Sequence, residues 1–454
     1  RTVTRAGHKE IKPLLTTKWG QGAPFNNYAP SLKLYDGKKA PAGCVAIAMA
    51  QCLNFQRYPA SAEFEGHYYQ EGVSDESYQG NVSTTYSWPY EDYYRYYYPE
   101  GSDTYVTVSS LPRQGNMVAT LCRDCAYSID MQYTMSGSGA YTFDVPDALI
   151  NRFSYPATAV RFYDRAFYST DEWLSLVYGE LEMGNPFIYS GSTAASGGHA
   201  FVADGCDSEG LIHFNWGWSG FCDGYFAMDV LTPDEDDFSD NQEIVTGIRP
   251  NTIDTDVYGS MVATSQPFEF GFDVESKTLW VKDYGLSNRG GKTIVGKVAI
   301  VFECLTNPEN TDYLWYMSDN PEDYDEEELS PDYYTLPPYY GWRASEDEYE
   351  LNEPFPEGTY KVYFASKDQH EDSWQMGRTY GGPFYYNMAV DASGNMTVSD
   401  VVYGKGEDTA VRDIKSDSFV SSSRIYDLQG HSLGTDASRL GRGLYIKGGK
   451  KILK

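Results

Sequence analysis

Cys44 has the clearest potential for chemistry in this sequence, because it opens an apolar stretch that is predicted to be a helix. The stretch 44–58 reads CVAIAMAQCLNFQRY, precedes Pro59 and has no polar face, which is typical of a helix buried on most sides. A thiol at a helix N-terminus has a lowered pKa, because unpaired amides and the helix dipole favour negative charge there. We therefore predict that Cys44 is a nucleophile, the alternative being a buried structural cysteine. Cys52, two turns further along, is predicted to belong to the core.

His199 is the candidate general base for such a thiol. The segments HAFVADG at 199–205 and GLIHFNWGW at 210–218 are typical of neighbouring strands separated by a turn. His199 and Asn215 lie on these two strands and are expected to meet on one face, where the Asn215 carbonyl would fix the imidazole tautomer. The alternative is a structural histidine. His213 is a weaker competitor, because it shares a strand with Asn215 and could not be oriented by it.

A thiol that attacks a carbonyl also needs donors for the oxyanion, usually its own amide and one side-chain amide. Gln21, in the loop-like segment WGQGAPFNNYAP, is the candidate donor, with a solvated loop residue as the alternative. Cys122 and Cys125 form a Cys-x-x-Cys without a second pair or histidine cluster at zinc-finger spacing, so we interpret them as structural. We expect neither a metal nor an organic cofactor.

The sequence divides into four segments of different composition. Residues 1–250 mix predicted helix and sheet, whereas 251–403 alternate short strands and turns, which predicts an antiparallel, Ig-like β-sandwich. Residues 404–423 are predicted to be a linker, and 424–454 a small C-terminal β unit. The acidic insert 321–334 lacks the ligand spacing of a calcium loop and is expected to be a solvated loop.

Composition limits the partners of the protein. The 454 residues include 35 basic and 65 acidic side chains, a net charge of −30 that disfavours nucleic acid. No apolar run is long enough to span a membrane, and the first thirty residues lack a signal core, so we expect any export signal to have been removed. The 41 tyrosines favour β structure and an extracellular setting. The seven cysteines would leave one unpaired thiol if the others formed disulfides.

Together these segments resemble the streptopain-like cysteine peptidases, a branch of the papain-like group. The resemblance rests on WGQGAPFNNYAP, on AGCVAIAMAQ with NFQRYP, and on SGGHAFVADG with FNWGWSGFCDGYFAMDVLTP, and it covers about 1–250. It implies an α+β catalytic domain of papain-like fold. The roles it implies are Gln21 as oxyanion donor, Cys44 as nucleophile, His199 as base, Asn215 as its orienting residue and Trp216 as the ring that shields their hydrogen bond.

The resemblance also implies how peptides would bind. Members of this family hold extended peptides through backbone contacts beside the catalytic histidine, a place matched by Gly198, and prefer an apolar side chain one residue before the cleaved position. The segment MSGSG at 135–139, with Gly137 and Ser138, loosely matches a cleft wall. The acidic segment PDEDDFSDNQ at 233–242 replaces a Gly-rich loop of the family. It is predicted either to attract peptides with Lys or Arg or to be a solvated loop without effect.

We therefore predict a secreted cysteine endopeptidase that forms a thioester acyl-enzyme on Cys44. The resemblance implies a zymogen whose pro-segment blocks the cleft, and the 43 residues before Cys44 resemble the mature form. The tail 424–454 resembles sorting or anchoring modules of secreted bacterial proteins, which predicts an extracellular or cell-surface location. The alternatives are a non-catalytic adhesin with a relic peptidase domain, and a Cys-His transferase with an amine acceptor.

Overall fold

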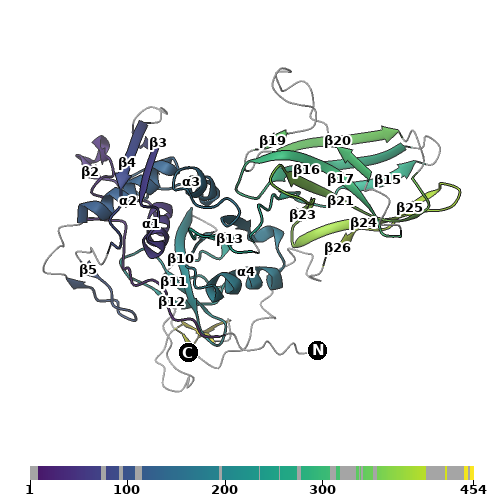
Figure 1. Ribbon diagram of the computed structural model, residues 1–454. Helices are drawn as coiled ribbons and strands as arrows, with labels where there is room; N and C mark the ends of the chain where they lie inside the picture. Colours follow the sequence, from purple (N-terminus) through teal and green to yellow (C-terminus); the bar gives the residue numbers. More distant parts are fainter. Residues whose placement is uncertain are drawn as a thin grey trace. The chain divides into compact units, whose positions relative to one another are not determined.

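The computed structural model carries side chains and is drawn in Figure 1. It describes residues 9–72, 78–90, 96–107, 115–193, 197–234, 236–254, 256–273, 278–306, 313–316, 334–336, 338, 341–350, 355–404, 425–426, 444–447 and 450–453. The chain forms two compact units. The described residues within 1–161 and 175–254 belong to the first unit, and those within 162–174 and 255–404 belong to the second.

Helix α1 (Cys44–Gln56) confirms the predicted helix at Cys44. Ten consecutive residues from Val45 to Asn54 are buried, because a helix that is apolar all round packs on every side. The helix ends where Arg57 adopts a left-handed conformation and donates its amide to the last turn. The other helices are α2 (Gly115–Ser128), α3 (Val145–Asn151) and α4 (Thr170–Glu182), with short 3-10 turns η1 (Lys33–Tyr35), η2 (Thr142–Asp144) and η3 (Arg165–Phe167).

The main sheet of the first unit has six strands, and α1 lies alongside its strand β10 (Figure 1). Its strands run in the order β12 (Gly224–Phe226), β11 (Ile212–Asn215), β10 (Gly198–Cys206), β9 (Phe187–Ser192), β13 (Asp240–Thr246) and β8 (Arg161–Asp164). Strands β10 and β11 are antiparallel neighbours, as predicted. Both are buried along almost their whole length, so polar side chains on them need partners inside the protein.

Three small sheets complete the N-terminal part. They pair β1 (Ser31–Leu32) with β2 (Lys38–Lys39), β5 (Tyr96–Tyr97) with β6 (Val106–Thr107), and β3 (Ser61–Gln70) with both β4 (Tyr78–Thr85) and β7 (Met131–Tyr133). Strand β7 leads directly into the segment 135–139, which the sequence places in a cleft wall. The mixed helix and sheet content predicted for 1–250 is thus confirmed.

The second unit is a mixed β-sheet that is nearly closed on itself around one core. Its strands are β14 (Val262–Ala263), β15 (Glu269–Asp273), β16 (Thr278–Asn288), β17 (Ile294–Cys304), β18 (Tyr313–Tyr316), β19 (Tyr334–Leu336), β20 (Gly341–Glu350), β21 (Gly358–Asp368), β22 (Gln375–Met376), β23 (Arg378–Thr379), β24 (Gly382–Val390), β25 (Met396–Val398) and β26 (Val402–Tyr403). The predicted β structure is confirmed. The sheet differs from two separate antiparallel sheets in two ways. Strands β14 and β23 are parallel, and β24 pairs with β21 as well as with β23, so that it joins both groups of strands.

Residues 321–333 of the acidic insert and 405–423 of the predicted linker lie outside the described residues. Within the C-terminal segment, β27 (Ile425–Tyr426), β28 (Leu444–Lys447) and β29 (Lys450–Leu453) form a three-stranded sheet. The predicted small β unit therefore has regular structure in its described part.

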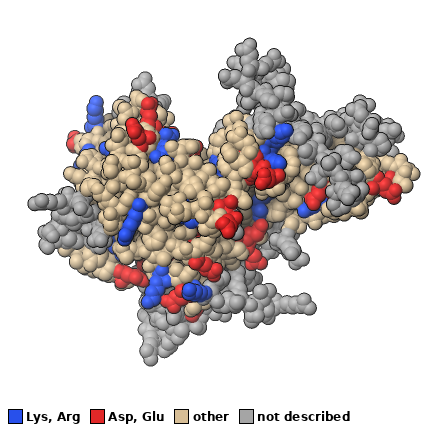
Figure 2. Space-filling view, in the orientation of Figure 1, with Lys and Arg blue, Asp and Glu red and all other residues tan. Residues whose placement is uncertain are grey.

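Charged groups are spread over the described surface. On the face shown in Figure 2, acidic and basic side chains are interspersed among uncharged ones, so the net charge of −30 is not collected in one patch there. No helix in the described part of the chain is long and apolar enough to cross a membrane. All seven cysteines are described and none forms a disulfide, so three disulfides with one leftover thiol are not seen.

Candidate active site

The catalytic candidates Cys44 and His199 line one cavity of about 970 Å³. Helix α1 brings Cys44 to it and strand β10 brings His199, although the two residues are far apart in the sequence. The predicted residues that line this cavity are Gln21, Cys44, Gly137, Ser138, Gly198 and His199. Asn215 and Trp216 are buried at the end of β11 and do not line it.

Cys44 is the first residue of α1 and follows Gly43, whose φ of 98° favours glycine. Burial raises the pKa of the Cys44 thiol, and hydrogen bonds from the amides of Ala200, Val45 and Cys44 itself oppose that rise. The net direction is the reverse of the lowered pKa expected from the helix N-terminus, because loss of solvent outweighs the amides. The resting sulfur is therefore protonated and needs a base that takes its proton.

His199 can be that base. Its ring is 9% exposed, and its Nε2 lies 2.8 Å from the carbonyl oxygen of Trp216. A carbonyl only accepts hydrogen bonds, so Nε2 carries the proton and Nδ1 keeps a lone pair. Burial lowers the pKa of His199 to about 4, although the bond to the Trp216 carbonyl works in the opposite direction. The imidazole is thus neutral at pH 7 and able to accept a proton.

The prediction that the Asn215 side chain orients His199 directly is wrong. Asn215 pairs with Val202 in the β10–β11 ladder, three residues from His199, and successive side chains of a strand point to opposite faces. The Asn215 side chain donates to the Thr17 carbonyl at 2.8 Å and accepts from Gly217 N at 3.1 Å instead. The backbone carbonyl of Trp216 takes the place that the sequence assigned to Asn215.

Gln21 connects both sides of the site. Its Oε1 accepts from the Gly43 amide at 3.0 Å, and its Nε2 donates to the Gly217 carbonyl at 3.3 Å. These partners fix the amide orientation, because an N–H must face Oε1 and a carbonyl must face Nε2. The second Nε2 proton remains for a group in the cavity, which Gln21 lines beside Cys44. This geometry suits the predicted oxyanion donor.

Aromatic rings cover the imidazole. The Trp218 ring stacks on His199 with centroids 4.7 Å apart, whereas the Trp216 ring is nearly parallel to it at 6.1 Å. Phe238 approaches at 5.5 Å from the acidic segment 233–242. Trp218, which the sequence did not single out, is thus the nearer cover, and it also lines the cavity.

The cavity wall is formed by short polar and glycine-rich segments. Ser138 is held by a 2.8 Å bond from its Oγ to the Pro41 carbonyl, and Gly198 begins β10 directly before the histidine. Asn241 and Glu243 of β13 also line the cavity, so the C-terminal end of the acidic segment reaches it. Glu243 accepts a long hydrogen bond of 3.5 Å from Ser190 Oγ.

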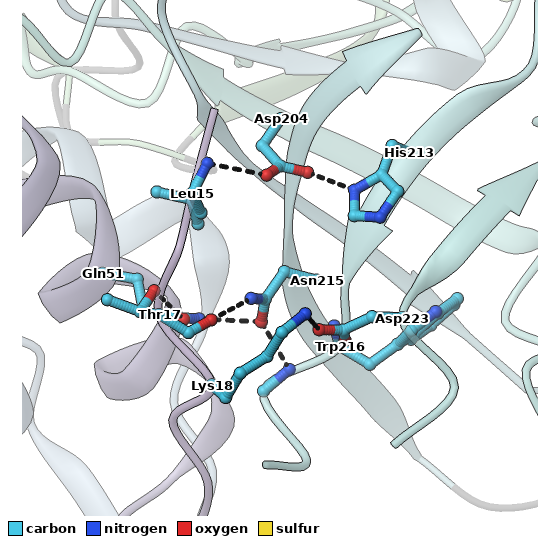
Figure 3. A network of polar contacts seen from close by, with 10 residues as sticks. Leu15, Thr17, Lys18, Gln51, Asp204, His213, Asn215, Trp216 and Asp223 are labelled. Carbon is cyan, nitrogen blue, oxygen red and sulfur yellow. Dashed lines mark hydrogen bonds and ion pairs between the residues drawn. The ribbon is translucent and has the colours of Figure 1, made fainter. Parts of the chain in front are cut away.

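His213, the competitor for the base, has a structural role. Its Nδ1 lies 2.6 Å from Asp204 Oδ1, and the other Asp204 oxygen accepts the Leu15 amide at 2.9 Å (Figure 3). Burial alone would lower the pKa of His213, but the Asp204 carboxylate raises it above its ordinary value. His213 does not line the cavity. Among the described residues, no group of three or more His, Cys, Asp or Glu side chains could hold a metal ion.

Sequence reasoning missed the polar residues behind the site. Thr17, Lys18, Gln51 and Asp223 form buried hydrogen bonds and an ion pair around the end of β11 (Figure 3). Gln51 could have been found, because it is the first polar residue after Cys44 and stands seven positions further along the predicted helix. Nothing in the local sequence marks Lys18 or Asp223 as partners.

Comparisons with known proteins find one matching family and several relatives. The pattern of the Peptidase C10 family matches residues 19–226. Thiol protease/hemagglutinin PrtT of Porphyromonas gingivalis is 32% identical over 256 residues, which are 55% of this chain and 27% of that protein. Streptopain of Streptococcus pyogenes is 31% identical over 279 residues, which are 55% of this chain and 66% of that protein. The chain thus spans less than two thirds of the length of either relative.

Solved structures of one further bacterial protease are also similar. Active wild-type interpain A cysteine protease of Prevotella intermedia is 34% identical with a TM-score of 0.46, covering 53% of this chain and 95% of that one. A prointerpain A fragment from the same organism is 33% identical with a TM-score of 0.44, covering 54% and 73%.

Proposed function

Because the chain contains a cysteine protease domain of the Peptidase C10 family, the family of streptopain, we propose that it is an active endopeptidase with Cys44 as nucleophile. The observation that carries this proposal is the shared cavity, which Cys44 and a neutral His199 both line while the Trp216 carbonyl holds Nε2. The reaction class is acyl transfer from a peptide to the thiol and then to water.

His199 Nδ1 takes the proton of the Cys44 thiol as the sulfur attacks the peptide carbonyl carbon. Charge develops on the carbonyl oxygen, where Gln21 Nε2 and the Cys44 amide donate, since the first amides of a helix lack intrahelical partners. The imidazolium gives its proton to the leaving amine, the C–N bond breaks, and a thioester remains. Nδ1 then deprotonates a water that attacks the thioester, and the released thiolate recovers its proton.

The proton transfer and the attack depend on each other in this site. Burial alone raises the pKa of Cys44 and lowers that of His199 to about 4, so each group is neutral on its own. A thiolate and an imidazolium formed together stabilise each other in the same desolvated place. The roles of the two residues are therefore tested as a pair.

An extended substrate is proposed to contact the backbone of Gly198 and the wall formed by Gly137 and Ser138. The position of all three on the cavity supports this proposal, as does the exposure of Gly198 at the start of β10. An apolar side chain one residue before the cleaved position is expected to be preferred. Cleavage-site profiling with a peptide library measures that preference.

The test of the catalytic assignment is labelling with a thiol-directed epoxysuccinyl inhibitor, followed by mass spectrometry. Of the seven cysteines, Cys44 is half-buried and the other six are buried, so exposure alone could also direct the label to Cys44. The His199→Ala variant separates the two explanations, because removal of the imidazole does not shield Cys44 from the inhibitor but does remove its activation. Fast labelling of Cys44 in the parent and slow labelling in His199→Ala support the proposal, and equal rates contradict it. Product analysis with an added amine distinguishes hydrolysis from a transferase.

Regulation and location are proposed from the relatives. A prointerpain A form is known for one relative, which supports a pro-segment that inhibits this domain before activation. The relatives come from bacteria, and secretion to the cell exterior or surface is proposed for this chain. N-terminal sequencing of the protein from culture supernatant and from cells tests both points.

An accessory role is proposed for 251–403 as an Ig-like module. Strands β15, β16, β17, β21, β24 and β25 supply inward side chains to one core, which supports this assignment. The parallel pairing of β14 with β23 is a departure from an all-antiparallel sandwich.

A further inference from the structure

The peptide that joins Trp216 to Gly217 carries two hydrogen bonds in opposite directions. Its carbonyl oxygen accepts from His199 Nε2 at 2.8 Å, and its N–H donates to Asn215 Oδ1 at 3.1 Å. Both groups belong to one planar unit, so fixing the N–H also fixes the direction of the carbonyl. Gly217 has a φ of 69°, which lets the chain turn sharply after this peptide.

The Asn215 side chain is itself held by the helix that carries the nucleophile. Gln51 Nε2 donates to Asn215 Oδ1 at 3.1 Å, and Thr17 Oγ1 donates to Gln51 Oε1 at 2.6 Å (Figure 3). Gln51 and Asn215 are 0% and 2% exposed, so these bonds do not compete with solvent. Gln51 stands seven residues after Cys44, which is two turns along the same side of α1.

A second group of side chains holds the peptide that joins Asn215 to Trp216. Trp216 N donates to Asp223 Oδ1 at 3.0 Å, and Lys18 Nζ lies 2.9 Å from Asp223 Oδ2 (Figure 3). Burial alone would lower the pKa of Lys18, but the Asp223 carboxylate raises it, which favours the charged amine. Burial raises the pKa of Asp223 as well, and Lys18 opposes that rise. Lys18 follows Thr17 directly, so one extended segment contributes to both groups.

We propose that Gln51 and the Lys18–Asp223 pair are positioning residues for the general base, acting through the backbone of Trp216. Asp223 accepts from the Trp216 amide on one side of the carbonyl bound to His199, and Gln51 holds the Asn215 oxygen that accepts from the Gly217 amide on the other side. They hold that carbonyl so that His199 keeps its proton on Nε2 and presents Nδ1 to the Cys44 thiol. This inference rests on the proposed function, in which His199 is the base.

The experiment compares Gln51→Met, Asp223→Asn and the parent on one peptide substrate. Methionine keeps the length of Gln51 without its hydrogen bonds, and asparagine keeps an oxygen for Trp216 N without the charge. Active sites are titrated with a thiol-directed inhibitor, so that kcat refers to folded sites. We expect kcat to fall about 10- to 100-fold with KM changed by less than about threefold, because a catalytic group displaced by about 1 Å loses rate of that order. The pH profile of the rate of Cys44 alkylation by iodoacetamide should also differ from that of the parent.

A matched control is Tyr86→Phe. It removes a buried 3.0 Å bond from the Tyr86 hydroxyl to Asp124 Oδ2 in the same unit, and neither residue lines the cavity. The control should lose stability while kcat per titrated site and the pH profile stay at parent values. Parent kcat and an unchanged pH profile in both Gln51→Met and Asp223→Asn would overturn the inference.

Three further variants keep the test decisive. If Gln51→Met does not fold, Lys18→Met takes its place, because the Lys18 side chain is 21% exposed and its loss is less disruptive. It has the same expected and contradicting results. The Cys44→Ala and His199→Ala variants test the proposed function separately. If these two are inactive while Gln51→Met and Asp223→Asn both match the parent, only the positioning role fails; if they keep turnover, the catalytic assignment itself fails.

Discussion

Removal of the Gln21 side chain should separate oxyanion stabilisation from the reactivity of the thiol. Gln21→Ala deletes an amide whose Nε2 borders the cavity and whose Oε1 accepts from Gly43 N. The Cys44 amide remains as the second donor. The variant should therefore lose a part of its turnover and not all of it.

The size of the loss follows from the two bonds that hold Gln21 and from the donor that it supplies. One oxyanion donor is worth roughly 100- to 1000-fold in kcat, or about 2.7–4 kcal/mol. The bonds of 3.0 and 3.3 Å to Gly43 and Gly217 contribute about 1 kcal/mol each to stability at most. The variant should thus remain folded, with a free energy of unfolding lower by about 1–2 kcal/mol.

The assay compares peptide hydrolysis with alkylation of Cys44 by iodoacetamide at the same pH. Hydrolysis develops an oxyanion and should fall in Gln21→Ala, whereas alkylation develops none and should stay within about threefold of the parent. Gln21→Glu is the matched variant, because it can still accept from Gly43 but places a carboxylate near the oxyanion, and it should be at least as slow. Parent turnover in Gln21→Ala would refute the assignment, and an equal fall in both reactions would show that Gln21 acts on the thiol.

Four further predictions concern the nucleophile, the two buried histidines and the cavity wall. Cys44→Ala should abolish hydrolysis and keep the circular dichroism and melting profile of the parent. His213→Ala should lose about 3–5 kcal/mol of stability, because Asp204 is left unpaired, but its kcat per titrated site should stay at the parent value. His199 has a folded pKa of about 4 against an ordinary value of 6.5, so the unfolded chain binds more protons between these values and stability falls as pH falls. Urea unfolding of the parent and His199→Asn should show the parent losing about 2–3 kcal/mol more between pH 7 and pH 4.5, and parallel losses would contradict the neutral buried imidazole. Glu243→Gln should reduce the preference for peptides with Lys or Arg over matched acidic peptides, less so in 1 M salt, and a preference unchanged at both salt concentrations would assign it to other groups.

Local patterns in the sequence were sufficient for the elements and for most of the residues around the cavity. An apolar run that begins with Cys44 makes a buried helix, and two short apolar runs around a turn make antiparallel strands. Hydrophobic periodicity and turn residues act over a few positions, so they can be read without the fold. The resemblance then supplied the order of Gln21, Cys44 and His199, all of which line the cavity.

The sequence could not determine which group orients His199. That choice depends on the register between β10 and β11, which places Asn215 opposite Val202 and on the other face from the imidazole. A shift of one residue would exchange the faces, and strand composition alone does not set it. Backbone carbonyls such as that of Trp216 are present at every position, so no residue type marks the one that is used.

By itself the sequence thus determined the helix, the strands and the chemical groups of the site, because each depends on residue type and short spacing. The pKa directions of Cys44 and His199 were decided by tertiary structure, since burial outweighs the local helix N-terminus. The convergence of Lys18, Gln51 and Asp223 on one backbone segment was likewise decided only by folding. Their partners are distant in the chain, and contacts of that kind exist only when the helix and the sheet are packed together.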